Sequence, residues 1–388
     1  KLDKLDTLEA REFSLPTAGL TPGDYAVQYE LLDKDSHVLV SAARDLILDP
    51  KLPDRIRSLR AQSEKLALAG VAAKGPLHAL AVETVEFVAA QYDAALRAPL
   101  AGYVQNMSPL AATLAGFSKP YYSTDSIVPA RDLPLAEELA EGLLAGASPL
   151  AARKGDLRLA YRSAPDQILV PFRIFLPPAY DPAKKWPLAV VLHGASGDEG
   201  SYFERYRDAA GENVTAKLAA GRGYIVLAPN GRGPASFYNA AGAQDVFDAV
   251  DRVKAAWSVD EKQVFLTGHS MGAMGTISLS LDARSRFAGF AAVAGVPITP
   301  MDYSKAPAVP FLFVHAGNDF FFPTDEVRRF GFVLEKRYKL FEYVEFPGVD
   351  HVAVGTASMP KVFDFFDSVR AGAFKPSGKS VPLPSNLK

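Results

Sequence analysis

Short apolar runs in the second half of the chain alternate with segments in which apolar residues recur every three or four positions. The run at 188–192, Leu-Ala-Val-Val-Leu, is apolar throughout, as expected for a strand buried on both faces of a sheet. This alternation predicts an α/β fold with a doubly wound, mostly parallel sheet. We expect an antiparallel strand pair at 157–162 and 168–176, further strands at 188–192, 224–228, 264–266, 290–293, 311–314 and 343–346, and helices at about 201–220, 244–256, 271–281, 325–338 and 359–370.

The first fifty residues have a different pattern, with period two. Apolar side chains alternate over 25–31, a polar turn follows at 33–36, and the alternation resumes at 38, with a further short strand expected at 46–48. The segment resembles the closing strands of an immunoglobulin-like module, although fifty residues are too few for a whole sandwich. We expect a partial module with a structural role, and binding of carbohydrate or a partner is the alternative.

Residues 52–150 have helical periodicity. Asp132 fits a helix cap, with Pro134 in the first turn of the helix that follows. We expect the apolar face of this region to dock the N-terminal part onto the sheet. The domains predicted are a β-rich module (1–50), a helical docking region (51–154), an α/β domain (155–374) and a mobile tail (375–388). One apolar stripe comprises Leu77, Ala81, Val85, Val88, Tyr92 and Leu96.

Composition excludes several classes of function. The formal net charge of the 388 residues is 42 − 44 = −2, so no nucleic acid partner is expected. No apolar run reaches the roughly 18 residues that span a bilayer. Cysteine is absent, which excludes disulfides, thiolate nucleophiles and cysteine zinc sites. The chain starts at Lys1 rather than Met, from which we expect a secreted or periplasmic protein whose signal peptide has been removed; a trimmed chain is the alternative.

A nucleophile motif lies where the predicted strand at 264–266 meets the helix at 271–281. Gly268-His269-Ser270-Met271-Gly272 has the form G-x-S-x-G in a strand–turn–helix context. A nucleophile on so sharp a turn has close neighbours two residues away on each side, which favours glycine at 268 and 272. We therefore expect Ser270 to be a nucleophile.

A serine hydroxyl needs a base within hydrogen-bond reach to accept its proton. His351 follows the last predicted strand, just before the final helix, where the order Ser…Asp…His places the base. We expect His351 to be that base. The histidines that fit this role less well are those at 37, 78, 193, 269 and 315, of which we expect His269 to point away from the site.

The base in turn needs a carboxylate to orient it. Asp319 directly follows the predicted strand at 311–314, and the carboxyl ends of strands are where ligand chemistry occurs in such sheets. Asp325 is the alternative, although a helix N-terminus favours an acidic residue there for dipole reasons alone. Asp350 fits a turn residue. We expect Asp319 to be the acid.

An oxyanion hole requires two backbone N–H groups near the nucleophile. The first should come from Met271, which follows Ser270 at the start of a helix. The second should come from the glycine turn after the strand at 188–192. Ala195 is the expected donor in this turn, with Gly194 as the alternative.

With these residues placed, residues 155–374 resemble the α/β-hydrolase family. The motifs are similar to those of esterases related to prolyl oligopeptidases, feruloyl esterases and polyhydroxybutyrate depolymerases. The resemblance implies a Ser270–His351–Asp319 triad, an acyl-enzyme on Ser270, no metal and no organic cofactor. The motifs that carry it are His193-Gly194, Pro229-Asn230-Gly231-Arg232-Gly233, Gly268-His269-Ser270-Met271-Gly272, Gly317-Asn318-Asp319 and Asp350-His351.

Aromatic residues cluster beside the predicted site. Phe320, Phe321 and Phe322 follow Asp319 directly. Exposed rings beside a nucleophile would suit an aromatic or otherwise apolar acyl group, whereas packing of at least two of the three phenylalanines under the loop is the alternative. The other candidate substrate contacts are Phe237 and Tyr238, and Arg232 is expected to pair with Asp245 as structural support of its loop.

The sequence thus favours a serine carboxylic-ester hydrolase that acts on small or aromatic, feruloyl-like esters, free or linked to a polysaccharide. A serine peptidase of the prolyl-oligopeptidase type is the first alternative. A binding module that retains the hydrolase fold without activity is the second. The oligomeric state is left open.

Overall fold

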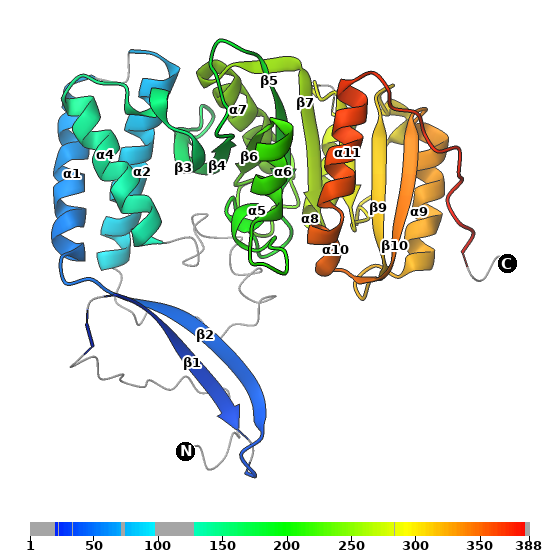
Figure 1. Ribbon diagram of the computed structural model, residues 1–388, viewed down its shortest axis with the longest axis horizontal. Helices are drawn as coiled ribbons and strands as arrows, with labels where there is room; N and C mark the ends of the chain where they lie inside the picture. Colours follow the sequence, from blue (N-terminus) through cyan, green and yellow to red (C-terminus); the bar gives the residue numbers. More distant parts are fainter. Residues whose placement is uncertain are drawn as a thin grey trace.

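An eight-stranded mixed sheet forms the centre of the molecule in a computed structural model (Figure 1). The structure describes residues 20–21, 23–32, 34–70, 74–97, 128–282 and 284–384. The strand order is β10-β9-β8-β7-β5-β6-β4-β3, and neighbours from β10 to β6 are parallel. β4 is antiparallel to both β6 and β3. The strands are β3 (Gly155–Arg162), β4 (Leu169–Leu176), β5 (Trp186–Leu192), β6 (Ile225–Pro229), β7 (Val259–His269), β8 (Gly289–Val293), β9 (Phe311–Asn318) and β10 (Phe341–Asp350). The predicted fold class and the antiparallel pair are confirmed.

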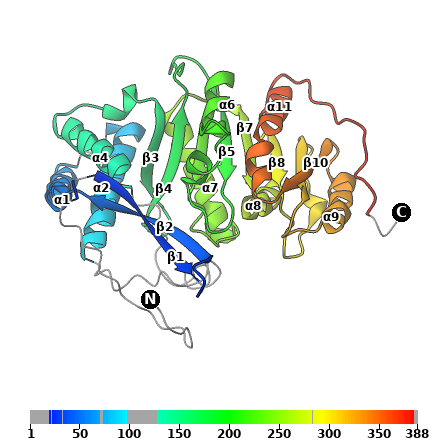
Figure 2. The ribbon, with the colours of Figure 1, turned by 60° about the horizontal axis from the view of Figure 1, so that its bottom comes forward.

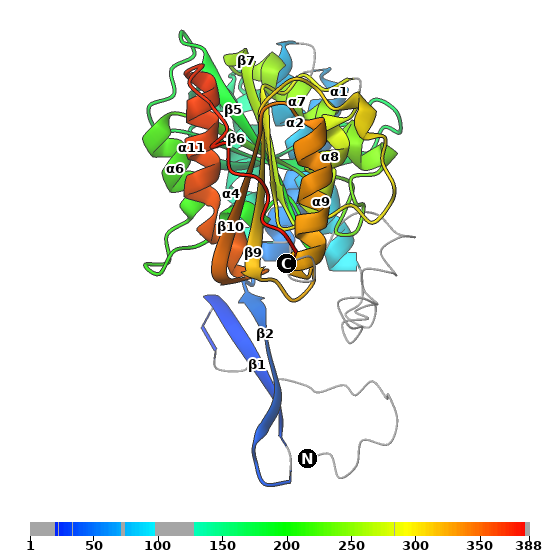
Figure 3. The ribbon, with the colours of Figure 1, turned by 90° about the vertical axis from the view of Figure 1, so that its right-hand side faces the viewer.

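Helices cover both faces of this sheet, each over its own apolar layer (Figure 3). α6 (Val214–Arg222) and α11 (Met359–Arg370) pack on one face, where Phe265 stacks on Phe366 at a centroid distance of 4.8 Å. α7 (Ala240–Ala256), α8 (Met271–Ser280) and α9 (Thr324–Arg337) pack on the other. The short helices are η5 (Pro149–Ala152), α5 (Ser201–Glu204), η6 (Tyr303–Lys305) and α10 (Ala353–Ala357).

One predicted helix is wrong in its extent. Instead of a single helix over 201–220, the chain forms α5, a turn and then α6. The carboxylate of Asp208 accepts hydrogen bonds from the backbone N–H groups of Ala210 and Glu212, and this local bonding competes with the helical ladder. Asn213 then caps α6 by accepting from the N–H of Ala216.

Three helices from the first half of the chain extend the structure beyond β3 (Figure 2). They are α1 (Leu52–Leu68), α2 (Pro76–Arg97) and α4 (Pro129–Leu144). α2 packs against β3, and the Thr84 hydroxyl accepts from the N–H of Ala160 at 3.0 Å. On the predicted stripe, Ala81, Val85, Val88 and Tyr92 are buried and Leu77 is partly buried. The side chain of Leu96 lies outside the described residues, and the docking role stays a prediction.

Asp132 is not a helix cap. α4 begins three residues earlier, at Pro129, and Pro134 lies inside the helix rather than in its first turn. The Asp132 side chain is buried, where it accepts hydrogen bonds from Tyr92 and Arg158. The interpretation failed because a buried arginine from another element recruits this carboxylate, and the local sequence carries no sign of that partner.

The described part of the N-terminal module is one hairpin, β1 (Gly23–Leu32) and β2 (Val38–Leu48). Gly23 pairs with Leu48, so residues 46–48 continue β2 and are not a further strand. The hairpin extends away from the sheet and its helices (Figures 1 and 3). Residues 1–19 lie outside the described residues, and the immunoglobulin-like interpretation stays a prediction.

The C-terminal segment, expected to be a mobile tail, is exposed over most of residues 375–383 but contacts the fold at Val381. Val381 is buried, and its methyl groups lie close to Gly331 of α9. The apolar residue anchors an extended segment whose composition otherwise predicts mobility. None of the helices in the described ranges is both long and apolar enough for a membrane span.

Candidate active site

Ser270 sits on a sharp turn between β7 and α8, with φ 58° and ψ −117°. Such a backbone conformation is strained for a residue that is not glycine. Close packing explains the glycines on either side. A Cβ at Gly268 would collide with the main chain of Gly272, and one at Gly272 would collide with the carbonyl of Leu192. The N–H of Ser270 donates to the carbonyl of Val293 at 2.9 Å, which ties the turn to the neighbouring strand.

The structure brings Ser270, His351 and Asp319 together. Nε2 of His351 lies 2.9 Å from Oγ of Ser270, and Nδ1 lies 2.8 Å from Oδ2 of Asp319. An aspartate oxygen accepts from Nδ1–H, so Nε2 is left to accept the serine proton. The other oxygen of Asp319 accepts from the N–H groups of Phe321 and Phe322, each at 2.8 Å, which fixes the carboxylate. This is the arrangement that activates a serine hydroxyl.

The two other aspartates considered from the sequence lie outside this chain of hydrogen bonds. Asp325, in the first turn of α9, is 3.5 Å from Arg328. Asp350 accepts from the N–H groups of Val352 and Ala353, as a turn residue does. Both contacts agree with the lesser roles that their positions in the sequence predict.

His269 has a place in the site that the sequence analysis missed. Its Nε2 donates to the carbonyl oxygen of His351 at 2.7 Å, and its Nδ1 lies 3.0 Å from the hydroxyl of Tyr206, which can donate to it. Burial lowers the pKa of His269 to about 4, so the ring is neutral at pH 7 and donates through Nε2. Tyr206 also packs against Gly355, in α10 just beyond His351. Nothing in the sequence near 269 predicts a contact 82 residues away.

His315 lies within β9, four residues before Asp319, and is fully buried. Its Nδ1 is 4.0 Å from Oδ2 of Asp319, too far for a hydrogen bond. Among the described residues neither ring nitrogen has a hydrogen-bond partner. Burial lowers the pKa of His315 to about 4.

The turn predicted to supply an oxyanion donor lies against the nucleophile. A Cβ added to Gly194 would be 3.4 Å from Cβ of Ser270. The turn is anchored where the N–H of Ser196, at φ 62°, donates to the carbonyl of Pro234 at 2.9 Å. Met271 opens α8, where the first N–H groups have no intrahelical acceptor. Met271, Ala195 and Gly194 therefore remain the predicted donors.

Exposed aromatic rings flank His351. Phe320 and Phe321 are each 64% exposed, with ring centroids 5.9 and 4.9 Å from that of His351. Phe322 is half-buried at 5.6 Å. Two of the three rings are therefore open to solvent, and the interpretation in which at least two pack under the loop is wrong.

The two predicted substrate contacts in the loop after β6 differ in exposure. Phe237 is 37% exposed, but Tyr238 is 1% exposed and its hydroxyl donates to the carbonyl of His193 at 3.2 Å. Tyr238 is thus no substrate contact; its ring fills the space left by Gly231 and Gly275.

Arg232 was expected to pair with Asp245. It lies 3.9 Å from that carboxylate and makes a closer ion pair, 2.6 Å, with Asp166. Asp245 itself accepts hydrogen bonds from the Tyr161 hydroxyl and the N–H of Gly231. Burial raises the pKa of Asp245 to about 6. The support role of Arg232 stays a prediction, with Asp166 as the nearer partner.

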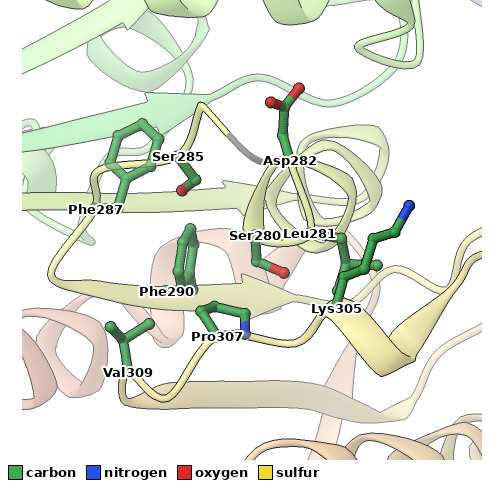
Figure 4. A pocket seen from close by; sticks show the side chains of 9 residues that line it. All are labelled: Ser280, Leu281, Asp282, Ser285, Phe287, Phe290, Lys305, Pro307 and Val309. Carbon is green, nitrogen blue, oxygen red and sulfur yellow. The ribbon is translucent and has the colours of Figure 1, made fainter.

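A pocket of about 360 Å³ lies near the first residues of β8 and β9, whereas Ser270 follows the last residue of β7 (Figure 4). It opens between the end of α8 and the beginnings of β8 and β9, and its lining includes Ser280, Phe290 and Val309. It contains none of the predicted site residues. Within the described parts of the chain, no group of three or more His, Asp or Glu side chains is placed to hold a metal ion.

A comparison with protein-family models matches residues 189–381 to the alpha/beta hydrolase family. Residues 189–381 therefore belong to the alpha/beta hydrolase family. The matched segment holds Ser270, Asp319 and His351, the predicted oxyanion donors, and all strands from β5 to β10 except the first residues of β5. The resemblance based on the motifs is thereby confirmed at the level of the family.

Curated relatives include an esterase and a peptidase. The bifunctional acetylxylan esterase/xylanase XynS20E of Neocallimastix patriciarum is 30% identical over 136 residues, which is 34% of this chain and 19% of that protein. Dipeptidyl-peptidase 5 of Porphyromonas gingivalis is 29% identical over 158 residues, 38% of this chain and 22% of that protein. The chain thus spans about a fifth of the length of these relatives.

The similar solved structures are more distant in sequence. The ferulic acid esterase of Anaeromyces mucronatus is 20% identical, with a TM-score of 0.44, over 52% of this chain and 87% of that chain. The S-formylglutathione hydrolase FrmB of Staphylococcus aureus is also 20% identical, with a TM-score of 0.45, over 55% of this chain and 98% of that chain.

Proposed function

We propose that this protein is a serine carboxylic-ester hydrolase that forms an acyl-enzyme on Ser270. The observation that carries the proposal is the hydrogen-bonded chain from Oγ of Ser270 through His351 to Asp319. A serine on a strained turn, with a base at 2.9 Å and the base fixed by a buried carboxylate, is the arrangement that nucleophilic acyl transfer requires.

In the acylation step, His351 Nε2 accepts the proton of Ser270 as Oγ attacks the ester carbonyl carbon. The carbonyl oxygen becomes an anion, which the N–H groups of Met271 and of Ala195 or Gly194 would stabilise. The imidazolium formed at His351 is balanced by the negative charge of Asp319. As the tetrahedral intermediate collapses, His351 returns its proton to the departing alkoxide, which leaves as an alcohol.

Deacylation repeats these steps with water in place of the serine. His351 accepts a proton from water, the hydroxide attacks the acyl carbon, and the same N–H groups hold the second oxyanion. When this intermediate collapses, Oγ of Ser270 takes the proton back and the carboxylic acid departs. Neither step needs a metal ion or an organic cofactor.

The exposed rings of Phe320 and Phe321 favour a small, aromatic or otherwise apolar acyl group. They stand beside His351, where a bound ester would have its reacting carbon. Flat rings can stack on an aromatic acyl group such as a feruloyl group, free or linked to a polysaccharide, and bury it from water. The acetylxylan esterase among the relatives supports an ester substrate.

A peptidase of the prolyl-oligopeptidase type is the second candidate, favoured by the similarity to a dipeptidyl peptidase. Hydrolysis of aminoacyl anilides, compared with that of p-nitrophenyl esters, separates the two activities. A binding module without activity would fail to react with a phosphonate probe at Ser270.

The experiment that tests the proposal is a chain-length series of p-nitrophenyl esters together with methyl ferulate, on the wild type and Ser270→Ala. If the three residues act as a unit, the substitution lowers kcat by roughly six orders of magnitude. The preferred acyl group then reports whether Phe320 and Phe321 line its site. A Ser270→Ala variant as active as the wild type would refute the proposal.

A further inference from the structure

The loop between β5 and α5, which carries the predicted oxyanion donors, contains a buried carboxylate. Glu199 is 1% exposed, and its Oε1 accepts from Nε of Arg158 at 2.8 Å. Arg158 lies on β3 and is itself 5% exposed. β3 is the outermost strand of the sheet, and it precedes the segment matched to the hydrolase family. The loop of the candidate site is thus tied to a part of the chain outside that segment.

The other side of Arg158 is held by the N-terminal helices. Its Nη1 donates to Oδ2 of Asp132 on α4 at 2.9 Å and to Oε1 of Gln91 on α2 at 3.2 Å. Its guanidinium also lies 5.1 Å from the ring centroid of Phe87 on α2. Two helices of the docking region therefore fix the side chain that binds Glu199.

From Glu199 the bonding continues to the turn itself. Oε2 accepts from the side-chain amide of Asn230 at 2.8 Å. Nε2 of His193 lies 2.7 Å from the carbonyl oxygen of Asn230, and its Nδ1 lies 2.9 Å from the carbonyl oxygen of Gly194; whichever nitrogen carries the proton donates. His193 immediately precedes Gly194 and Ala195. The buried groups thus run without a break from α4 to the residue that begins the turn.

Burial of these charges makes the arrangement sensitive to the loss of any member. The side chains of Asp132, Arg158 and Glu199 are each 3% exposed or less. An ion taken from water into a protein interior is costly, and removing one partner leaves another uncompensated. Once Arg158 is left short of a partner, the structure can relieve the cost by letting water in or by moving the loop.

We propose that helices α2 and α4 help to hold the oxyanion turn in place, with Asp132, Arg158 and Glu199 as positioning residues. The inference rests on the proposed function, since it takes 193–195 as the turn that supplies an oxyanion donor. Asp132 on α4 then affects catalysis through Arg158, Glu199 and the turn. A donor displaced by about 1 Å costs up to a hundredfold in rate.

The test compares Asp132→Asn and Glu199→Gln with the matched control Glu137→Gln. Glu137 also lies on α4 and forms a two-bond ion pair with an arginine, Arg55 of α1, at 2.8 Å for each bond, but it has no part in the route to the turn. We expect kcat on p-nitrophenyl esters to fall about tenfold in Asp132→Asn and up to a hundredfold in Glu199→Gln, with KM within twofold. Glu137→Gln should keep kcat within twofold even where its Tm falls.

Amide hydrogen exchange over residues 193–197 gives a readout that does not depend on activity. Exchange there should be faster in Asp132→Asn and Glu199→Gln, and unchanged in Glu137→Gln. An unchanged kcat in the two test variants, an equal loss of kcat in the control, or unchanged exchange would each overturn the inference. If the wild type hydrolyses no ester, the proposed function fails, while the exchange data still decide whether the helices hold the turn.

Discussion

The two sides of the candidate site are held by different parts of the chain. On the side of the base, His351 is fixed by Asp319, which follows β9, and by His269, the last residue of β7 in the same sheet. On the side of the oxyanion turn, the support passes through Asn230 and Glu199 to Arg158 and the N-terminal helices. The base is thus held by residues that contact it directly, whereas the turn is held through a series of hydrogen-bonded residues.

This difference shows which supports of the site lie inside the segment that matches the family. Residues 189–381 include Asp319 and His269, the two residues that fix His351. They do not include Arg158 or Asp132, which complete the support of the turn. A fragment limited to the matched segment would therefore keep the base side and lose part of the turn side. Substitutions on the two sides should accordingly differ in how much they lower activity and in which group they displace.

The largest loss of activity is expected from Asp319→Asn, which removes the carboxylate that orients the base. The amide can donate toward Nδ1 of His351 and so favours the wrong tautomer, in which Nε2 carries a proton and cannot accept one from Ser270. We expect kcat/KM for a p-nitrophenyl ester to fall by about 10⁴. Asp325→Asn is the matched control, because Asp325 bonds to Arg328 and not to His351. An equal loss in the control would show that the acid has been misassigned.

A smaller loss is expected from His269→Leu, which leaves the three reacting residues intact. The carbonyl of His351 then loses its donor, and Tyr206 loses its acceptor. A slightly misplaced base should lower kcat by about 10- to 100-fold, with KM little changed. His269→Gln, whose amide can donate to the same carbonyl, should recover part of kcat. If Leu and Gln have the same effect, the hydrogen bond has no role in positioning the base.

Most of the fold and the central residues of the site could be predicted from the sequence, because both depend on local pattern. The apolar run at 188–192 predicts a buried strand, and Gly268 and Gly272 around Ser270 predict the turn. Asp319 and His351 were found because they follow strands. The supports could not be found in this way, because they join residues far apart in the chain.

The roles of Asp132 and Tyr238 could not be predicted from the residues next to them in the sequence. Asp132 has the sequence features of a helix cap, and its true partner, Arg158, lies 26 residues away on a strand that would have to be docked first. Tyr238 has the features of an exposed loop aromatic. The space that it fills exists because Gly231 and Gly275 lack side chains, and these residues meet only in the folded protein.

The smallest effect should come from His315, a buried histidine on the base side that, unlike His269 and His351, has no hydrogen-bond partner among the described residues. Its folded pKa of about 4 lies below the 6.5 of the free side chain, so the unfolded chain binds more protons as pH falls from 6.5 to 4. The wild type therefore loses stability over this window through His315, whereas His315→Leu does not. We expect the free energy of unfolding of the variant, relative to the wild type, to rise by about 1–2 kcal/mol between pH 7 and pH 5.

Urea unfolding at the two pH values measures this difference. Asp245, whose folded pKa is raised to about 6, changes stability in the opposite direction over part of the same window, but it is present in both proteins and cancels in the comparison. Charged groups near His315, namely Asp319, Glu345 and Arg328, are also unchanged. If the difference in stability does not change with pH, the ring acts through packing alone. Of the two buried histidines whose pKa is lowered, His269 alone would then reduce stability on protonation at low pH.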